Sequence, residues 1–341
     1  RLLNFISRAV ENLSLKTQNK EYENKLFSSY ELIGDSKNII NIKDQIEKIS
    51  ITESRIFING PSGSGKELIA RKIHKNSKRK SKPFIIINGA LLDNDKYDLE
   101  LFGEEKNDGS ISYGALEKAN KGTLLVDQVS EIPLAIQSKI LRVLTDQKFK
   151  RVNGNNDINV DVRLICSSSK DLKQEVELGN FREDLFHRLN VFEINIKPLN
   201  ERVSDIPLLI KYFSNKISES YNIKNLEIDE NNSYILNHDW HGNVRELRNL
   251  IERIAILQPN TQEKVSNIIK ESLKSGVNSS RFNENSLSVP LKEAREKFEK
   301  EYLSLQLKKF NGNISKTATF VGMERSALHR KLKGLGIKEF N

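Results

Sequence analysis

The sequence has a single cysteine, Cys166, and no apolar run as long as the ~18 residues that a membrane-spanning helix needs. One cysteine excludes an internal disulfide bond and a cysteine-rich metal cluster, and it fits a reducing compartment such as the cytoplasm. The place of Cys166 at the end of an apolar strand suits a small buried residue. Internal repeats are also lacking. Because the first residue is Arg1 and not methionine, we expect further protein upstream.

Acidic residues are scarce at the end of the chain. The whole sequence has 55 Lys and Arg against 46 Asp and Glu, a net charge of +9. Residues 291–341 hold 12 of the basic residues and 6 glutamates, which leaves +6 in this segment. A basic terminal region is typical of a protein that binds DNA or RNA. A solvated, lysine-rich surface explains the charge alone equally well.

Short apolar runs alternate with longer amphipathic stretches between residues 30 and 199. This alternation predicts an α/β fold with a parallel sheet covered by helices on both faces. Apolar residues from Leu2 to Leu13 recur at helical spacing, so residues 1–29 are expected to form a helical linker, either paired with its twin or docked singly. The expected strands are 55–60, 83–89, 122–127, 160–168 and 191–196, and the expected helices include 65–76, 134–147 and 181–189.

Helical patterns dominate the rest of the chain. Residues 200–258 have apolar spacing typical of helices and no convincing strand, which predicts a small helical subdomain. Residues 259–290 are polar and rich in Asn, Ser and Lys, and we interpret them as a flexible linker. Residues 291–341 are predicted to form helices only.

A glycine-rich loop gives the strongest local signal. An apolar run leads into the sequence GPSGSGK at 60–66, and a helix is expected to follow. The glycines let successive N–H groups point at phosphate oxygens, and the helix N-terminus adds its positive end. Glu67 stands where a hydroxyl that binds Mg²⁺ is usual. The predicted nucleotide-binding residues of this loop are Gly60, Pro61, Ser62, Gly63, Ser64, Gly65, Lys66 and Glu67.

An acidic residue ends another apolar strand. Leu124, Leu125 and Val126 are followed by Asp127, the position of a carboxylate that binds Mg²⁺ at a phosphate site. The next residue, Gln128, is an amide where a catalytic carboxylate is expected. A carboxylate accepts a proton or polarises water, whereas an amide only orients water by hydrogen bonding.

Several segments together resemble the AAA+ domain of the bacterial enhancer-binding proteins, the activators of sigma-54 RNA polymerase. The resemblance covers roughly residues 30–258, and the sequence at 311–337 resembles the Fis-type helix-turn-helix that closes these proteins. Within the family, the chain is most similar to the NtrX-type response regulators. The matching segments are LIGDS (32–36), GPSGSGKELIARKIH (60–74), ELFGEE (100–105), GALEKANKGTLLVDQ (114–128), LRVLTDQKFKRVNG (141–154), VDVRLICSSSKDL (160–172), FREDLFHRLNVF (181–192), ERVSDIPLL (201–209) and WHGNVRELRNLIER (240–253).

The resemblance implies a AAA+ P-loop NTPase fold with a helical lid, and ATP and Mg²⁺ as cofactors. Glutamate commonly follows the loop lysine in this family, so Glu67 fits the pattern. Ile33 and Gly34 of the LIGDS segment would lie at the nucleotide, and Arg245 would be the sensor-2 arginine that contacts phosphate in the same subunit.

Arginine fingers would link one subunit to the next. Arg182 and Arg188 match the family positions that reach the γ-phosphate of a neighbouring subunit and neutralise charge there. From the residues alone, such a pair cannot be told from surface arginines. Because arginine fingers act on a neighbouring subunit, the resemblance implies a ring, usually a hexamer. It also implies an upstream receiver domain that a cognate sensor histidine kinase phosphorylates, as in NtrY/NtrX-type systems.

Three departures from the family pattern weaken the predicted motor. The sigma-54-contacting GAFTGA motif is absent from the interval 104–113, which is also several residues short. Gln128 replaces the catalytic glutamate, and Ser168 and Ser169 replace the Thr-Asn pair at the sensor-1 position, with Ser169 as the candidate nucleotide contact. Loss of a catalytic carboxylate typically lowers the rate about 10²–10⁴-fold. Some GTPases position water with glutamine, so a slow residual hydrolysis is compatible with Gln128.

The C-terminal sequence divides into two short helices. Asn313 or Ser315 is predicted to cap the first helix, and Gly322 to provide the turn. The outer face of the second helix is expected to enter a major groove, with lysines on the phosphates. The predicted core is Ala318, Val321, Leu328, Leu332 and Leu335; the predicted DNA-binding residues are Lys316, Arg325, Ser326, His329, Arg330, Lys331 and Lys333; and the predicted dimer contact is Phe298, Tyr302, Leu303 and Leu305.

These features favour a DNA-binding transcription regulator, the output of a two-component system, that binds ATP and hydrolyses it slowly or not at all. The alternative is a working ATPase that remodels sigma-54 polymerase; the absent GAFTGA motif and Gln128 argue against it. A AAA+ chaperone-like machine without a DNA contact is disfavoured by the basic terminal helices.

Overall fold

The computed structural model describes residues 31–91, 96–106, 108–221, 223, 226, 228–257, 261–278, 299–300, 302–304, 306–307, 310 and 313–335. The chain divides into two compact units, residues 1–271 and 272–341, and each is considered by itself. The linker helix expected over residues 1–29 lies outside the described residues. No helix in the described part of the chain is long and apolar enough to cross a membrane.

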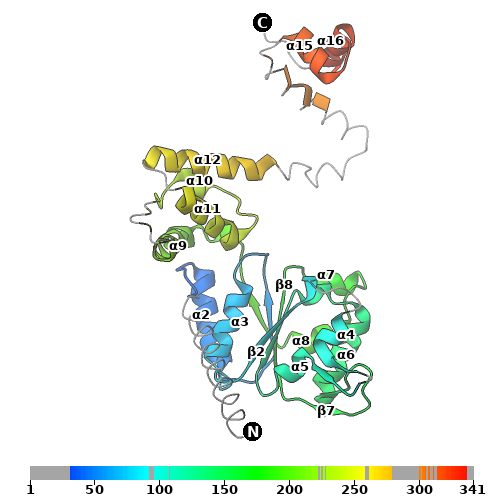
Figure 1. Ribbon diagram of the computed structural model, residues 1–341. Coiled ribbons are helices and arrows are strands. Elements are labelled where there is room, and N and C mark those ends of the chain that lie inside the picture. Colours follow the sequence, from blue (N-terminus) through cyan, green and yellow to red (C-terminus); the bar gives the residue numbers. More distant parts are fainter. Residues whose placement is uncertain are drawn as a thin grey trace, which may run out of the picture. The chain divides into compact units, whose positions relative to one another are not determined.

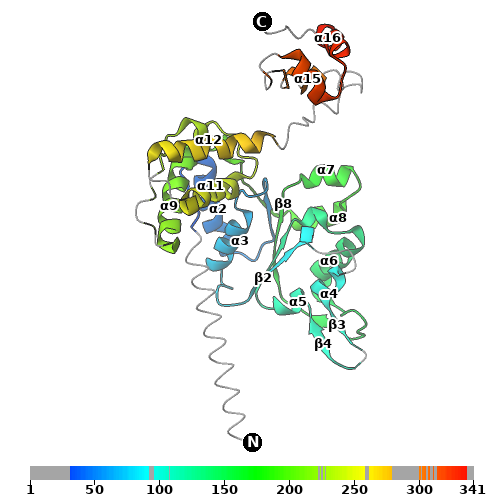
Figure 2. The same cartoon turned by 45° about the horizontal axis from the view of Figure 1, so that its top comes forward.

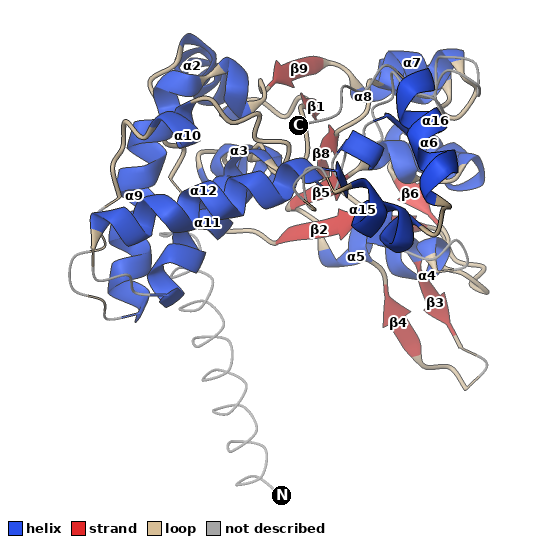
Figure 3. Ribbon diagram, turned by 90° about the horizontal axis from the view of Figure 1, so that it is seen from above, coloured by secondary structure: helices blue, strands red, loops and turns tan. Residues whose placement is uncertain are grey.

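A five-stranded parallel sheet forms the centre of the first unit (Figures 1 and 3). Its strands are β1 (Ile56–Asn59), β2 (Phe84–Asn88), β5 (Thr123–Asp127), β8 (Arg163–Ser168) and β9 (Phe192–Asn195). They lie in the order β2-β5-β8-β1-β9, and all neighbours are parallel. Each strand falls within one of the five apolar runs, which confirms the predicted parallel sheet.

Helices cover both faces of this sheet, as Figure 1 shows. They are α2 (Lys37–Ser50), α3 (Lys66–Lys75), α4 (Tyr97–Phe102), α5 (Ala115–Lys118), α6 (Leu134–Asp146), α7 (Leu172–Glu177) and α8 (Glu183–Leu189). Successive strand residues point to opposite faces. Leu124 and Val126 therefore pack with residues of α4–α8, whereas Leu125 packs with α2 and α3. The helices predicted at 65–76, 134–147 and 181–189 correspond to α3, α6 and α8.

Two short antiparallel hairpins add to the unit, and the sequence did not predict them. β3 (Gly103–Glu105) pairs with β4 (Ile111–Tyr113), and β6 (Lys148–Phe149) pairs with β7 (Ile158–Asn159). Strands of two or three residues are too short to show an alternating pattern. The β3–β4 hairpin occupies the interval that lacks the GAFTGA motif, and it projects beside α4 (Figure 2).

A group of helices follows the last strand and confirms the predicted helical subdomain. It consists of the 3₁₀ turns η3 (Leu199–Glu201) and η4 (Val203–Asp205) and the helices α9 (Ile206–Tyr221), α10 (Ser233–Leu236) and α11 (Asn243–Leu257). Helices α9 and α11 pack together. The subdomain is called the lid below.

The prediction of a flexible linker over 259–290 is wrong for a long part of that range, because helix α12 (Gln262–Asn278) occupies it. Val265, Ile269 and Leu273 are buried. These three apolar residues are spaced four apart, so they line one face of a helix. This apolar spacing outweighs the Asn- and Ser-rich composition of the segment.

The second unit is a small helical bundle. It contains α15 (Ile314–Val321) and α16 (Arg325–Gly334), which Gly322, at φ +71°, joins through a left-handed turn. The side chain of Asn313 accepts a hydrogen bond from the backbone N–H of Lys316, so Asn313 is the cap. The predicted core is confirmed: Ala318, Leu328 and Leu332 are buried, and Val321 and Leu335 pack against them.

One part of the predicted dimer contact lies inside this core instead. Leu303 is buried against α15 and α16, together with Leu307. An apolar side chain that fills its own domain's core is not available to a second copy. Tyr302 is exposed, while Phe298 and Leu305 lie outside the described residues.

Candidate functional site

The phosphate loop joins β1 to α3 at the carboxyl edge of the sheet. Gly60, Gly63 and Gly65 all have positive φ, at 156°, 75° and 111°. A Cβ at position 63 would lie 2.1 Å from the carbonyl oxygen of Gly242 in the lid. Only glycine allows this approach, so the loop and the lid meet through their backbones.

Unpaired donors line the inside of the loop. The backbone N–H groups of Gly63, Gly65 and Lys66 donate to no acceptor in the described part of the chain. The hydroxyl of Ser64 is buried, also without a partner among the described residues. Buried polar groups are nearly always paired, so a set of free donors around a helix N-terminus fits a bound anion. The residues present therefore fit a phosphate group.

Lys66 lies in the centre of this loop and is only 6% exposed. Its Nζ donates to the carbonyl oxygens of Gly60 and Pro61, at 2.7 and 3.1 Å. Burial lowers the pKa of the ammonium group, the carboxylate of Asp127 opposes that change, and Arg245 adds to it. A desolvated lysine held by two carbonyl groups is ready to pair with a phosphate.

Asp127 ends β5 beside the loop, and its two oxygens are held by different strands. The hydroxyl of Ser167, on β8, donates to Oδ1, and the amide of Asn88, at the end of β2, lies 3.4 Å from Oδ2. The described residues contain no cluster of three metal-ligating side chains. Mg²⁺ at phosphate sites commonly takes one or two carboxylates and completes its shell with water and phosphate, so a lone Asp127 fits that use.

Gln128 has a strained backbone, at φ 54° and ψ 52°, in a region that side chains other than glycine rarely adopt. Its Oε1 accepts hydrogen bonds from the backbone N–H and the hydroxyl of Ser169, at 3.0 and 2.8 Å. A backbone N–H only donates, so the atom that faces it is the amide oxygen. The remaining polar atom of Gln128 is the Nε2 donor, which has no partner in the described part of the chain.

The two serines at the sensor-1 position have different roles. Ser168 is buried, and its hydroxyl contacts Ser130 and the carbonyl of Lys170. Ser169 alone turns toward Gln128. Ser169 therefore contacts the residue beside Asp127, and its predicted contact with the nucleotide stays a prediction.

The lid is tied to the loop by its own residues. The amide of Asn243 donates to the carbonyl of Ser62 at 3.0 Å and accepts from the backbone N–H of Leu199 at 2.8 Å. Arg245 contacts the Ser62 hydroxyl through its guanidinium at 3.3 Å and the Gly63 carbonyl through its backbone. The predicted sensor-2 residue therefore lies against the phosphate loop.

Arg202 is a site residue that the sequence did not single out. It is 3% exposed, donates to the carbonyl of Ser64 at 3.0 Å, and has an Nε without a partner in the described part of the chain. Burial lowers its pKa, which Asp205 partly opposes. Arg202 and Asn243 lie within the segments ERVSDIPLL and WHGNVREL, which carry the family resemblance. The resemblance predicted no role for either residue.

A cavity of about 610 Å³ lies between the sheet and the lid. Aromatic and aliphatic side chains of α9 close one end, among them Tyr212 and Phe213, and the phosphate loop forms the other. A mostly apolar end beside a phosphate cradle suits a nucleoside with its phosphates. Of the predicted residues, the cavity is lined by Ile33, Ser62, Gly63, Ser64, Gly65, Lys66, Glu67, Asp127, Gln128 and Arg245.

Other predicted residues lie outside this lining. Gly34 packs on Asp205, and a Cβ there would lie 2.7 Å from that carboxylate. The same carboxylate accepts hydrogen bonds from the backbone N–H groups of Asp35 and Ser36. Gly34 therefore allows the segment before α2 to pack closely on Asp205 of the lid. Gly60 and Pro61 act through Lys66, as described above.

Arg182 and Arg188 are exposed and away from the cavity of their own chain. Arg182 stands before the first residue of α8, where it pairs with Asp184 at 2.8 Å, so only Arg188 is within the helix. The structure of one chain does not bring these arginines to the phosphate loop. Their finger role stays a prediction about a second subunit.

A basic face occupies one side of the second unit. Lys316, Arg325, Ser326, His329 and Arg330 are exposed on α15 and α16. Lys331 differs, because its Nζ pairs with Glu299 at 2.8 Å. The side chain of Lys333 is outside the described set.

The two units thus define a class of protein: a AAA+ P-loop domain with its lid, joined to a helix-turn-helix. Three family models match the chain in this order. They are the Sigma-54 interaction domain at residues 32–195, the AAA+ ATPase lid domain at 200–285 and the Bacterial regulatory protein, Fis family, at 294–335.

Relatives named NtrX narrow the class. The Nitrogen assimilation regulatory protein NtrX of Azorhizobium caulinodans is 42% identical over 99% of this chain and 76% of its own length. A Putative response regulator NtrX-like of Rickettsia felis is 44% identical over 99% of this chain and 73% of its own length. The chain therefore belongs to the NtrX-type response regulators.

Solved structures agree with this assignment. Crystal structures of NtrX from Brucella abortus, in complex with ADP and with ATP, are 42% identical to this chain and superpose with TM-scores of 0.73 and 0.71. They cover 98% and 96% of this chain, which spans 76% and 74% of theirs.

Proposed function

We propose that this protein is the DNA-binding output of a two-component system, binds ATP with Mg²⁺ in its AAA+ domain, and hydrolyses ATP slowly or not at all. The free N–H groups of the phosphate loop, Lys66 and Asp127 support the binding. Asp127 would hold Mg²⁺, which would neutralise phosphate charge there. The NtrX structures with ADP and ATP support the same nucleotide class.

The contact between Ser169 and Gln128 carries the argument against fast hydrolysis. It occupies the oxygen of the amide and leaves only an N–H donor free. A donor orients a water molecule or a phosphate oxygen, but it cannot accept the proton that an attacking water releases. The phosphate cradle is intact, so the site would bind ATP without hydrolysing it quickly.

A fixed hairpin argues against sigma-54 activation. The guanidinium of Arg151 pairs with both oxygens of Glu117, at 2.8 and 2.6 Å, and with Glu105 on β3 at 2.8 Å. It also lies 5.5 Å from the ring centroid of Tyr113 on β4. One arginine thus ties both strands of the β3–β4 hairpin to α5. This short hairpin lacks the GAFTGA motif, and its two strands are anchored to α5 through Arg151.

Self-association and the kinase partner complete the proposal. Arg182 and Arg188 are exposed for contact with a neighbouring subunit, which supports a ring. A sensor histidine kinase would act on a receiver domain outside this chain. The basic face of α15 and α16 would contact promoter DNA, and dimerisation would use surfaces other than Leu303.

Measuring ATP affinity and steady-state hydrolysis on the same preparation, with and without DNA, tests the proposal. We expect saturable ATP binding and turnover well below about 1 s⁻¹, the low end of ordinary enzymes. Turnover at or above that rate, together with sigma-54-dependent open-complex formation, would establish the alternative, an active sigma-54 activator. The match to the Sigma-54 interaction domain is the observation that favours this alternative.

A further inference from the structure

Six exposed lysines surround the edge of the sheet where β2 and β5 begin. The basic patch is defined as Lys75, Lys78, Lys80, Lys82, Lys118 and Lys121. None of them forms an ion pair with a residue in the described part of the chain. No acidic residue occurs between Glu67 and Asp93, so the sequence supplies no local counter-charge. Ordinary soluble surfaces mix charges of both signs.

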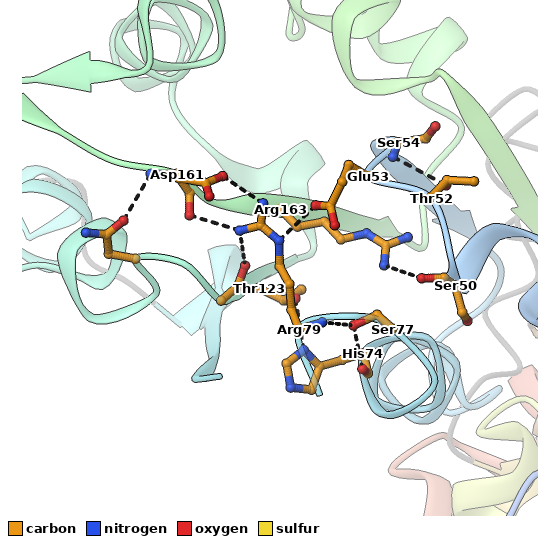
Figure 4. Close-up of polar contacts among 12 residues, drawn as sticks. Ser50, Thr52, Glu53, Ser54, His74, Ser77, Arg79, Thr123, Asp161 and Arg163 are labelled. Atoms are coloured by element: carbon orange, nitrogen blue, oxygen red, sulfur yellow. Dashed lines mark hydrogen bonds and ion pairs between the residues drawn. The ribbon is translucent and has the colours of Figure 1, made fainter. Parts of the chain in front are cut away.

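The carboxylates of Glu53 and Asp161 pair with Arg79, as Figure 4 shows. Arg79 Nε donates to Glu53 at 2.8 Å, and its NH2 group donates to the carboxylate of Asp161 at 2.7 Å. Its remaining nitrogen donates to the carbonyl oxygens of Gly122 and Asp161. The arginine side chain is only 14% exposed. Arg79 is therefore turned inward, away from the lysines on either side of it.

A second arginine balances the charge beneath the patch. Arg163, at 2% exposure, donates to the carbonyl oxygens of Ser50 and Ile49, at 3.1 and 2.8 Å. Arg79 and Arg163 thus lie near Glu53 and Asp161, whose side chains are 50% and 64% exposed, and these four groups are neutral as a set (Figure 4). The positive charge of the outer lysines is left uncompensated.

The turn that carries four of the lysines is well fixed. Backbone bonds run from Ser77 to His74, from Lys80 to Ser77 and from Lys82 to Arg79, at 2.8 to 3.3 Å. The backbone N–H of Thr123 donates to Pro83 at 2.9 Å. This bond joins the turn to the segment that bears Lys118 and Lys121, so the two lysine-bearing segments lie side by side at this edge of the sheet.

We propose that the basic patch binds the phosphate backbone of duplex DNA. It is a second DNA contact, on the AAA+ domain, beyond the one proposed for the helix-turn-helix. No large apolar side chain is exposed in the described segments 75–83 and 118–122. A protein or lipid partner would therefore find no apolar anchor there, whereas DNA phosphates need only charge. The lysine ammonium group is a point charge that pairs with phosphates and does not distinguish between bases. The affinity of this contact is therefore independent of the DNA sequence.

Fluorescence titration of the full chain with a random-sequence duplex, over a series of salt concentrations, tests the patch. The patch variant is Lys78→Gln/Lys80→Gln/Lys82→Gln. The matched control is Lys37→Gln/Lys173→Gln/Lys211→Gln, which removes the same charge from exposed lysines on α2, α7 and α9. A third protein, Arg325→Ala/Arg330→Ala, reports on the helix-turn-helix. Thermal unfolding confirms that each variant is folded.

We expect the patch variant to lose about 2 to 3 units from the slope of log K against log salt, at ~0.9 for each phosphate contact, and about tenfold or more in affinity near 0.1 M salt. The control should keep the wild-type slope. Equal slopes in the wild type and the patch variant overturn the patch, and so do equal losses in patch and control variants. An unchanged helix-turn-helix variant overturns the proposed function of that unit instead, so the two failures are distinguishable.

Discussion

The backbone N–H and the hydroxyl of Ser169 both donate to Oε1 of Gln128, at 3.0 and 2.8 Å. In a Gln128→Glu variant, one carboxylate oxygen would accept the same two bonds. The other oxygen would take the place of Nε2 and supply the proton acceptor that the site lacks. We expect steady-state ATP turnover to rise by up to about 10²-fold, with little change in ATP affinity.

A Gln128→Ala variant is the matched control, because it removes the amide without adding a base and should not raise turnover. Adding Ser169→Ala to Gln128→Glu should reduce the gain, since the carboxylate then loses the hydroxyl donor and keeps only the backbone N–H of residue 169. Flat turnover in Gln128→Glu, at unchanged affinity, would contradict the assignment of Gln128 as the limiting residue.

Lys66→Ala should abolish measurable ATP binding in calorimetry. The variant loses the buried cation at the centre of the phosphate loop and its two bonds to the carbonyl oxygens of Gly60 and Pro61. Lys75→Ala, on the same helix but exposed, should bind ATP like the wild type. Unaltered ATP affinity in the folded Lys66→Ala protein would show that the nucleotide binds elsewhere.

Two neighbouring residues of α16 should differ in their effect on DNA binding. Arg330 is exposed, and we expect Arg330→Ala to weaken binding to target duplexes by about 1–3 kcal/mol, the usual cost of a lost arginine contact. Lys331 is neutralised by Glu299, so Lys331→Ala should change affinity less. Titrations at one fixed salt concentration compare the two. A larger loss for Lys331→Ala would mean that the ion pair opens on DNA.

Burial should make the stability of the AAA+ domain depend on pH through His74. Its ring is 4% exposed and contacts Thr123 at 2.9 Å, and burial lowers its pKa to about 4, against the ordinary 6.5. The unfolded chain binds the proton first as pH falls, so this stabilising contribution is complete above pH ~6.5 and is lost progressively down to pH ~4. The full difference is on the order of 3 kcal/mol.

Urea unfolding at several pH values within that window measures the effect. His74→Gln removes the titrating group, so the variant should lose less stability between neutral and mildly acidic pH than the wild type does. Identical pH profiles for the two proteins would place the acid sensitivity in other groups.

Local sequence patterns were enough to predict the elements whose apolar residues form a clear pattern. The five strands are apolar runs bounded by turn residues, and the phosphate loop follows the first of them. Helix α12 shows the limit of composition, because three apolar residues spaced four apart outweigh a polar background once they have a surface to pack on. Hairpins of two or three residues per strand left no periodic signal at all.

By itself, the sequence determined the phosphate loop, the parallel sheet and the replacement of a carboxylate by Gln128, because each depends on residues adjacent in the chain. Only the tertiary structure decided what Gln128 does. The pairing of β5 with β8, with Val126 opposite Cys166, brings the residues after both strands to one edge of the sheet. Ser169 reaches Gln128 there across 41 positions of sequence. The inward turn of Arg79 depends in the same way on partners far along the chain, and no local pattern encodes such contacts.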